Sequence, residues 1–102
     1  MKEKTVVLSE DVTLDIEEIS NYIVSISRPE HAEKYVQQLL DDIASLSYMA
    51  SLRPESQWMI PKRFHPHAKV LLSHNKKWSI IFHINNDYAI VDRIIPSCMI
   101  TY

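Results

Sequence analysis

The 102-residue sequence lacks glycine altogether and contains a single cysteine, Cys98. One cysteine cannot form an internal disulfide, which is typical of a cytoplasmic protein. No apolar run approaches the roughly 20 residues of a membrane span, and only a short apolar stretch follows the start, so we expect no membrane segment and no export signal. Because glycine is absent, hairpin turns that need positive φ must use Asn or Asp.

Charge is distributed unevenly along the chain, although the net charge is only −2. Residues 1–52 carry four basic and ten acidic side chains, whereas residues 53–102 carry seven basic and three acidic ones. Four of the five histidines also lie in the second half. Such asymmetry predicts a basic surface for an acidic partner, either RNA, DNA or an acidic protein segment. The alternative is that the two halves simply attract each other.

The first part of the chain predicts a strand followed by a helix. Thr5–Leu8 is a short β-branched run, and Ser9, which two acidic residues follow, has the character of a helix N-cap. In the helix, isoleucines recur at three- and four-residue steps and form one apolar stripe: Ile16, Ile19, Ile23 and Ile26. We expect the acidic side chains to lie off this stripe on a solvated face, namely Asp15, Glu17 and Glu18.

A second helix is predicted to begin near Ser27. Ser27 and Glu30 have the spacing of a capping box, and Pro29 falls in the first turn, where its missing N–H costs nothing. The apolar period continues to about Ala50, before a proline ends the helix. Because the connection between the two helices is short, they must form an antiparallel hairpin.

The second half predicts an irregular connection and then three strands. Residues 53–67 contain three prolines and no clear period. Three β-rich runs follow, which are Lys69–Ser73, Lys77–Ile84 and Tyr88–Ile95. The element order is therefore β-α-α-β-β-β. This is an α+β fold in which an N-terminal helical hairpin packs on a small antiparallel sheet, within a single domain of residues 1–102.

Several segments carry a further similarity. Ser9-Glu10-Asp11 opens the first helix, Asp15–Ile19 and Tyr22-Ile23 lie within it, and Trp78–Ile84 and Val91–Ile95 lie within the last two strands. Their order and spacing, from about Thr5 to Ile95, resemble the RelE/ParE superfamily of bacterial toxins. The resemblance implies a growth-inhibiting toxin of a type II toxin-antitoxin system, of the kind that stabilises plasmids. It also implies a hetero-oligomer with a cognate antitoxin that neutralises the toxin, and no cofactor.

The superfamily divides in mechanism, and the C-terminal segment distinguishes the two types. Relatives that cleave messenger RNA on the ribosome need a base, an acid and cations for the charged transition state, and their terminal segment usually supplies one of these groups. Here that segment, Pro96–Tyr102, offers only Tyr102. The resemblance therefore implies a ParE-like toxin that inhibits DNA gyrase and is not an enzyme. The alternatives are an inactive binding relative, or a metal-independent, ribosome-dependent mRNA endoribonuclease that uses His83, Arg93, Lys69 and Arg63.

The loop between the last two strands decides which side chains share a face with Arg93. A two-residue loop places Arg93 with Trp78, Ile80 and Phe82. A three-residue loop, residues 85–87, builds a cation pair suited to phosphate, because it places Arg93 with Ser79, Ile81 and His83. The alternative for Arg93 is a salt bridge to an acid of the first helix or to Asp92. The alternative for His83 is a strand histidine satisfied by a neighbour.

The remaining basic side chains and the terminal tyrosine are predicted to contact the target or the antitoxin: Lys62, His65, His67, Lys76, Lys77 and Tyr102. His65 and His67, with His74 nearby, have imidazoles at a spacing that can share a zinc ion. No cysteine or acidic ligand stands at a standard spacing from them. We therefore expect a basic contact surface and no metal.

Overall fold

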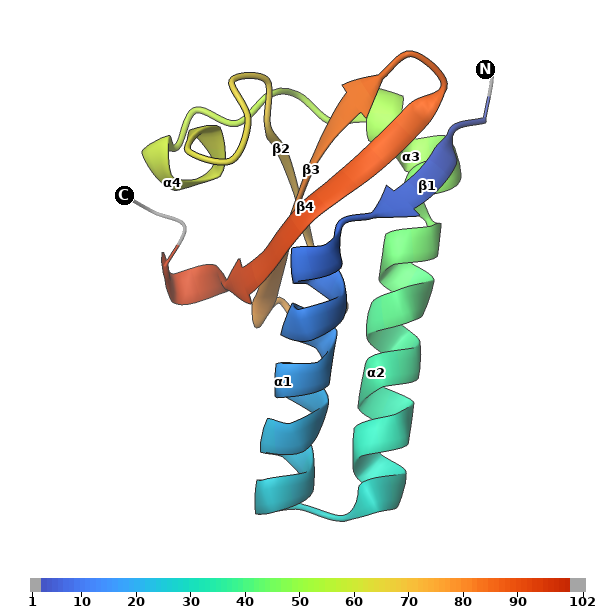
Figure 1. The fold of residues 1–102 in the computed structure, drawn as a ribbon, viewed down its shortest axis with the longest axis vertical. Coiled ribbons are helices and arrows are strands. Elements are labelled where there is room, and N and C mark those ends of the chain that lie inside the picture. The colour runs from blue at the N-terminus through green and yellow to red at the C-terminus, as the bar shows by residue number, and fades with distance from the viewer. Residues whose placement is uncertain (1–2, 100–102) are drawn as a thin grey trace.

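Two long helices lie side by side against one face of a four-stranded sheet (Figure 1). The computed structural model describes residues 3–99. The strands are β1 (Thr5–Leu8), β2 (Lys69–Leu72), β3 (Trp78–Asn85) and β4 (Tyr88–Pro96). The helices are α1 (Glu10–Ile26), α2 (Pro29–Ala44), α3 (Leu46–Met49) and α4 (Met59–Lys62), with the 3-10 turns η1 (Ala50–Leu52) and η2 (Ser97–Met99). No helix within residues 3–99 is long and apolar enough to cross a membrane.

The sheet has the strand order β1-β4-β3-β2 and is mixed, which corrects the expectation of an antiparallel sheet. β2, β3 and β4 form antiparallel hairpins, as expected, but β1 runs parallel to β4. The reason is the connection between them. A parallel pair needs a long crossover, and the two helices provide the length that brings the chain back to the same end of the sheet.

Ser9 joins the end of β1 to the start of α1. Its side chain accepts a hydrogen bond from Val12 N–H at 3.3 Å, which confirms the predicted N-cap. Its hydroxyl also donates to the carbonyl of Asp92 at 2.9 Å, and its N–H donates to the carbonyl of Val91 at 3.1 Å. Ser9 therefore bonds both to the first turn of α1 and to the backbone of β4, which fixes the start of the helix at the edge of the sheet.

The predicted capping box of the second helix is wrong. Arg28 occupies the N-cap position and makes no side-chain cap, while Ser27 Oγ is hydrogen-bonded to His31 Nδ1 at 2.6 Å. Pro29 takes the first helical position, as expected. The helix also stops before the predicted Ala50: it ends at Ala44, where the Ser45 hydroxyl donates to the carbonyl of Asp42 at 2.6 Å, and the chain resumes as α3.

The two hairpin turns differ in how they manage without glycine. Asn86, with φ of 55°, takes the left-handed position between β3 and β4, as the sequence predicts. In the turn between β2 and β3 this position belongs to Lys76, with φ of 63°, rather than to Asn75. The Asn75 side chain instead accepts hydrogen bonds from Lys77 N–H at 3.0 Å and from the Ser73 hydroxyl at 2.8 Å, which hold the turn from within.

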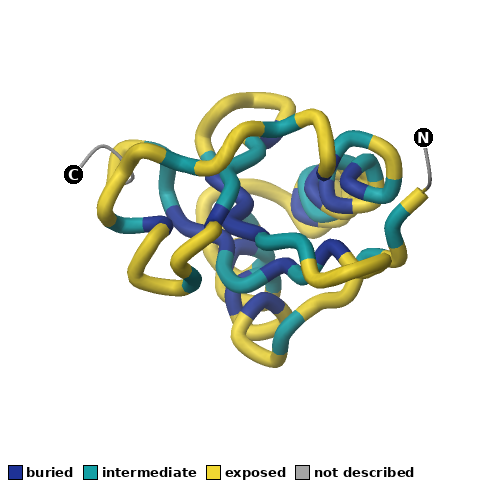
Figure 2. The backbone as a smooth tube through the Cα atoms, turned by 90° about the horizontal axis from the view of Figure 1, so that it is seen from above, coloured by how far each residue is buried: buried dark blue, intermediate teal, exposed yellow. Residues whose placement is uncertain are grey.

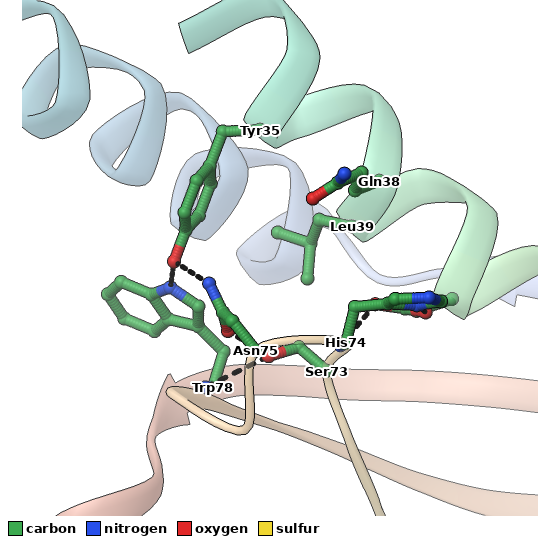
Figure 3. A pocket seen from close by; sticks show the side chains of 8 residues that line it. Tyr35, Gln38, Leu39, Ser73, His74, Asn75 and Trp78 are labelled. Carbon is green, nitrogen blue, oxygen red and sulfur yellow. Dashed lines mark hydrogen bonds and ion pairs between the residues drawn. The ribbon is translucent and has the colours of Figure 1, made fainter. Parts of the chain in front are cut away.

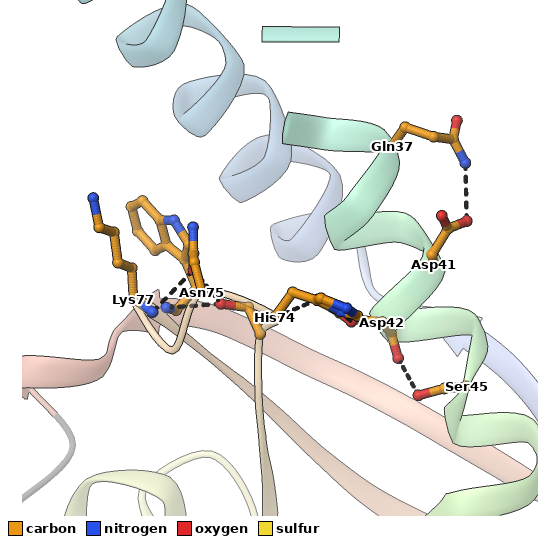
Figure 4. A network of polar contacts seen from close by, with 9 residues as sticks. Gln37, Asp41, Asp42, Ser45, His74, Asn75 and Lys77 are labelled. Atoms are coloured by element: carbon orange, nitrogen blue, oxygen red, sulfur yellow. Dashed lines mark hydrogen bonds and ion pairs between the residues drawn. The ribbon is translucent and has the colours of Figure 1, made fainter. Parts of the chain in front are cut away.

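The turn between β2 and β3 is also fastened to α2. Tyr35 Oη accepts hydrogen bonds from Trp78 Nε1 and from Asn75 Nδ2, both at 2.7 Å (Figure 3). About two helical turns further on, Asp42 accepts from the backbone N–H of His74 at 2.8 Å and pairs with His74 Nδ1 at 2.8 Å (Figure 4). The space left between these side chains is only about 10 Å³, too small for a ligand. These contacts therefore fix the sheet onto the helical hairpin.

Apolar side chains cover both faces of the sheet, as its continuous Ile and Val runs predict. The larger core cluster joins both long helices to β3 and β4, with Val12, Ile19, Leu39, Ile43, Ile80, Phe82, Val91 and Ile94 among its buried members. The smaller cluster lies on the other face and consists of Ala68, Ile81 and Ile95, with Ile60 and Val70 packed against them. Figure 2 shows the buried positions gathered in the middle of the molecule.

We predict that the His74–Asp42 pair makes stability depend on pH. The hydrogen bond between the His74 ring and the Asp42 carboxylate raises the pKa of His74 above its ordinary value of 6.5. The pair therefore stabilises the fold fully below about pH 6.5 and loses this contribution as the pH rises through the folded-state pKa. The urea midpoint of the wild type should exceed that of His74→Asn most at low pH, with the difference narrowing above about pH 6.5.

The matched control is the same substitution in an Asp42→Asn background, where His74→Asn should have an effect that does not change with pH. A wild-type advantage that stays constant between about pH 5 and 8.5 would contradict the assignment.

Candidate functional site

A β-bulge at Asp92 determines what surrounds Arg93. The loop between β3 and β4 has two residues, because Asn85 pairs with Tyr88. The register then shifts: Phe82 pairs with Val91, but Ile81 pairs with Arg93, so Asp92 is the extra residue. Arg93 therefore lies opposite Ile81 although the loop is short. The structure thus combines the two-residue loop of one predicted register with the Arg93–Ile81 neighbourhood of the other, which neither prediction contained.

Arg93 is held by Asp15 of α1. Its Nε donates to Asp15 Oδ2 at 2.8 Å and its Nη2 donates to Asp15 Oδ1 at 3.1 Å, while Ile94 N–H also donates to Oδ2 at 3.0 Å. β1 ends at Leu8, so from that point α1 supplies the partners for the outer edge of β4. The hydrogen bonds that Arg93 donates to Asp15 raise the pKa of Arg93 and keep the guanidinium charged. Of the sequence alternatives, the salt bridge to a helix acid is the one present.

Asp15 itself was expected on the solvated face of the helix, and this expectation is wrong. The residue is buried, whereas Glu17 and Glu18 are exposed. The signal was present in the sequence, because Asp15 precedes Ile19 by four residues and residues at this spacing share a helix face. A carboxylate on the buried stripe needs a partner, and Arg93 provides it.

His83 lies on the face of the sheet opposite the long helices, where two groups cover it. Its Nδ1 pairs with Asp92 Oδ2 at 2.7 Å, and its ring stacks on that of His65, with centroids 3.7 Å apart and planes inclined by 2°. Only 13% of the His83 side chain is exposed. The stack is a contact that no periodicity in the sequence predicts, because His65 comes from the irregular connection after α4.

His65 carries no proton on Nδ1 in this arrangement. That atom accepts a hydrogen bond from His67 N–H at 3.0 Å. Burial, and the neighbouring His83, lower the pKa of His65 below 6.5. Arg93 of β4 is also covered by an aromatic ring, because its guanidinium lies 5.7 Å from the centre of the Phe64 ring. Consecutive residues 64 and 65 thus cover Arg93 and His83.

The four residues considered for a nuclease do not form one site. Lys69 pairs across the sheet with Phe82, whose side chain faces the helices, and its Nζ donates to the carbonyl of Ala50 at 3.3 Å. Burial lowers the pKa of Lys69. Arg63 is exposed just after α4, and its side chain makes no hydrogen bond or ion pair with residues 3–99. Only His83 and Arg93 lie near each other, and each is bound to a carboxylate.

The residues predicted to bind a partner are dispersed. Lys62 lies at the end of α4, His67 pairs with Glu55 Oε1 at 3.1 Å, and Lys76 and Lys77 lie in the turn between β2 and β3. Tyr102 lies outside the described residues. His74 is bound to α2, away from His65 and His67. Within the described part of the chain, no group of three or more His, Cys, Asp or Glu side chains is placed to hold a metal ion.

A groove of about 380 Å³ lies between α1 and the end of β4. Its walls include the Asp15–Arg93 pair, the exposed Tyr22, and the apolar side chains Ile19, Trp78, Ile94, Ile95 and Met99. The groove is open to solvent and lies beside, not over, the covered His83.

The sequence and the structure give different results when they are compared with known proteins. No model of a known protein family matches the sequence, and no curated protein matches it either. The structure, however, matches a chain of the "Chromosomal ParDE TA system from P. aeruginosa" with a TM-score of 0.80, covering 94% of this chain and 98% of that one at 18% sequence identity. The chain has a ParE-like fold. This confirms the fold that the resemblance to the RelE/ParE superfamily implied.

We predict that the ParE-like fold loses stability when Arg93 is replaced by Met. The Asp15 carboxylate would then stay buried with only one N–H donor. The expected loss is about 2 kcal/mol, below the roughly 3–5 kcal/mol of a fully buried pair, because the guanidinium is partly exposed. Urea unfolding measures it.

Two further variants control this experiment. Arg28→Met, at an exposed arginine, should change the free energy of unfolding by less than about 0.5 kcal/mol. Asp15→Asn in the Arg93→Met background should recover part of the loss, because it removes the buried charge. Equal stability of Arg93→Met and the wild type would show that the pair contributes nothing.

The His65–His83 stack generates a prediction of opposite sign to that for His74. Because the folded-state pKa of His65 lies below 6.5, the unfolded chain binds the proton more readily. Stability is therefore kept above about pH 6.5 and falls as the pH drops towards the folded-state pKa. His65→Phe keeps an aromatic ring without a titrating group, so the wild type should lose stability relative to this variant on acidification. An equal difference in unfolding free energy between the wild type and His65→Phe at about pH 5 and pH 7.5 would contradict this prediction.

Proposed function

We propose that this protein is the toxin of a type II toxin-antitoxin system, which a cognate antitoxin neutralises in a hetero-oligomeric complex. The observation that carries the proposal is the likeness to a chain of a ParDE toxin-antitoxin system over nearly the whole length of both chains. The same superfamily is implied independently by motifs from Ser9 to Ile95. An ordinary coincidence of small α+β folds would not account for both.

We further propose that the target is DNA gyrase, bound as a protein, rather than ribosome-bound messenger RNA. Cleavage of RNA needs a base and a cation that are free to reach the phosphate and the 2′-hydroxyl. Here Arg93 is bidentate on Asp15, His83 is bound to Asp92 beneath His65, and Lys69 lies on the other face of the sheet. These contacts favour a toxin that works by binding.

Expression of the chain alone should arrest growth, and purified protein should inhibit supercoiling by gyrase. Co-expression of a short reading frame that adjoins or overlaps the gene should restore growth, because the antitoxin covers the toxin. Unimpaired supercoiling at excess toxin would exclude gyrase as the target.

The nuclease alternative has its own readout. Messenger RNA in a translating extract should stay intact when the protein is added. Cleavage that disappears in both His83→Ala and Arg93→Ala would instead identify an endoribonuclease. If expression neither arrests growth nor cleaves RNA, the chain is a binding relative without toxic activity.

A further inference from the structure

The segment around α4 is anchored by its middle and exposes both of its ends. Ile60 packs against the smaller core cluster and Pro61 is buried. The residues on either side are exposed, and we call them the α4 patch: Trp58, Met59, Lys62, Arg63 and Phe64. Figure 1 shows α4 well away from the two long helices. The sequence Trp-Met-Ile-Pro-Lys-Arg-Phe therefore builds a surface with an internal anchor.

The apolar part of the α4 patch is large for so short a segment. The exposed fractions are 48% for Trp58, 67% for Met59 and 38% for Phe64. Trp58 also borders a groove of about 300 Å³, whose other walls include Arg53, Pro54 and Val70. Exposed apolar side chains that gather in one place mark interaction surfaces, and methionine adapts to varied partners.

The charged part of the α4 patch is purely cationic. The side chains of Lys62 and Arg63 make no ion pair or hydrogen bond with residues 3–99. No Asp or Glu occurs between Ser56 and Asn86, and Glu55, just before this range, is paired with His67. Two free cations beside exposed apolar side chains are complementary to a surface that is acidic and partly apolar.

The α4 patch is also held in place before any partner binds. The His65–His83 stack and the contact of Phe64 with Arg93 fix the residues that follow α4 onto the sheet. The Arg53 guanidinium donates twice to the carbonyl of Val70, at 3.1 and 3.3 Å. These hydrogen bonds fix the segment that precedes α4 onto β2. Pre-ordered side chains lose less conformational entropy on binding.

We propose that the toxin binds its protein target through the α4 patch, and that the α4 patch docks on an acidic surface of the target that presents at least one apolar side chain. This inference rests on the proposed toxin function. A protein partner fits better than a nucleic acid for two reasons. The protein has a net charge of −2, and the patch offers two free cations, whereas nucleic-acid binding relies on many phosphate contacts. Three exposed apolar side chains, by contrast, suit a protein interface.

The test reverses the charge of the α4 patch. Lys62→Glu/Arg63→Glu should raise the toxin concentration that halves gyrase supercoiling, and the inducer level that halves growth, by at least about tenfold. Its thermal midpoint should stay within a few degrees of the wild type because both side chains are exposed. Met59→Ser should weaken inhibition in the same direction. Lys62→Arg/Arg63→Lys keeps the charge and should stay toxic.

A matched charge reversal elsewhere separates local contact from net charge. Arg28→Glu/Lys34→Glu changes two exposed cations of the helical hairpin by the same four units of charge as the patch variant, and it should leave inhibition unchanged. Equal loss of inhibition in both glutamate variants would overturn the assignment to the α4 patch.

Three further outcomes are distinguishable. Full toxicity of the folded Lys62→Glu/Arg63→Glu variant would overturn this inference alone. A wild-type chain that never arrests growth contradicts the proposed function and this inference with it. Tight binding of the wild type to a fluorescent oligouridine of about 20 nucleotides, lost in the patch variant, would assign the patch to nucleic acid instead.

Discussion

The carboxylate of Asp15 connects helix α1 to strand β4 of the sheet. β1 ends at Leu8, so the last part of β4 has no neighbouring strand on that side. Asp15 of α1 provides hydrogen-bond acceptors there in place of a strand. One carboxylate accepts hydrogen bonds from the N–H of Ile94 and from Nε and Nη2 of Arg93. Because a buried charge without partners is costly, these contacts position α1 and β4 together. The groove beside the pair depends on the same contact.

The bulge at Asp92 has a second consequence for the arrangement of the sheet. It moves Arg93 opposite Ile81 and leaves the Asp92 carboxylate beside His83. Two neighbouring residues of one strand thus serve two carboxylate pairs, Asp92 with His83 and Asp15 with Arg93. The site therefore consists of side chains that are already paired, and the cationic side chains Lys62 and Arg63, which have no partner among residues 3–99, lie at the end of α4 and directly after it.

Local signals predicted the elements well where a single residue type decides the geometry. Ser9 caps α1, Asn86 adopts positive φ, and Thr5–Leu8 is a strand. The site was less predictable because it depends on contacts between distant residues. The bulge has no marker in the sequence, the stack of His65 on His83 joins an irregular segment to a strand, and Lys76 takes a left-handed turn because Asn75 is occupied with other hydrogen bonds. The roles assigned to individual side chains stay predictions.

The pairing of β1 with β4 constrains how the chain acquires its structure. Thr5 lies beside Tyr88 and Leu8 beside Val91, so β1 cannot pair with β4 until both long helices and the strands β2 and β3 have been synthesised. Closing so long a stretch of chain carries an entropic cost and slows folding. During synthesis the α1–α2 hairpin can form early, whereas the complete sheet, and with it the Asp15–Arg93 contact, forms only once β4 has emerged. The complete fold therefore exists only after β4 has been synthesised.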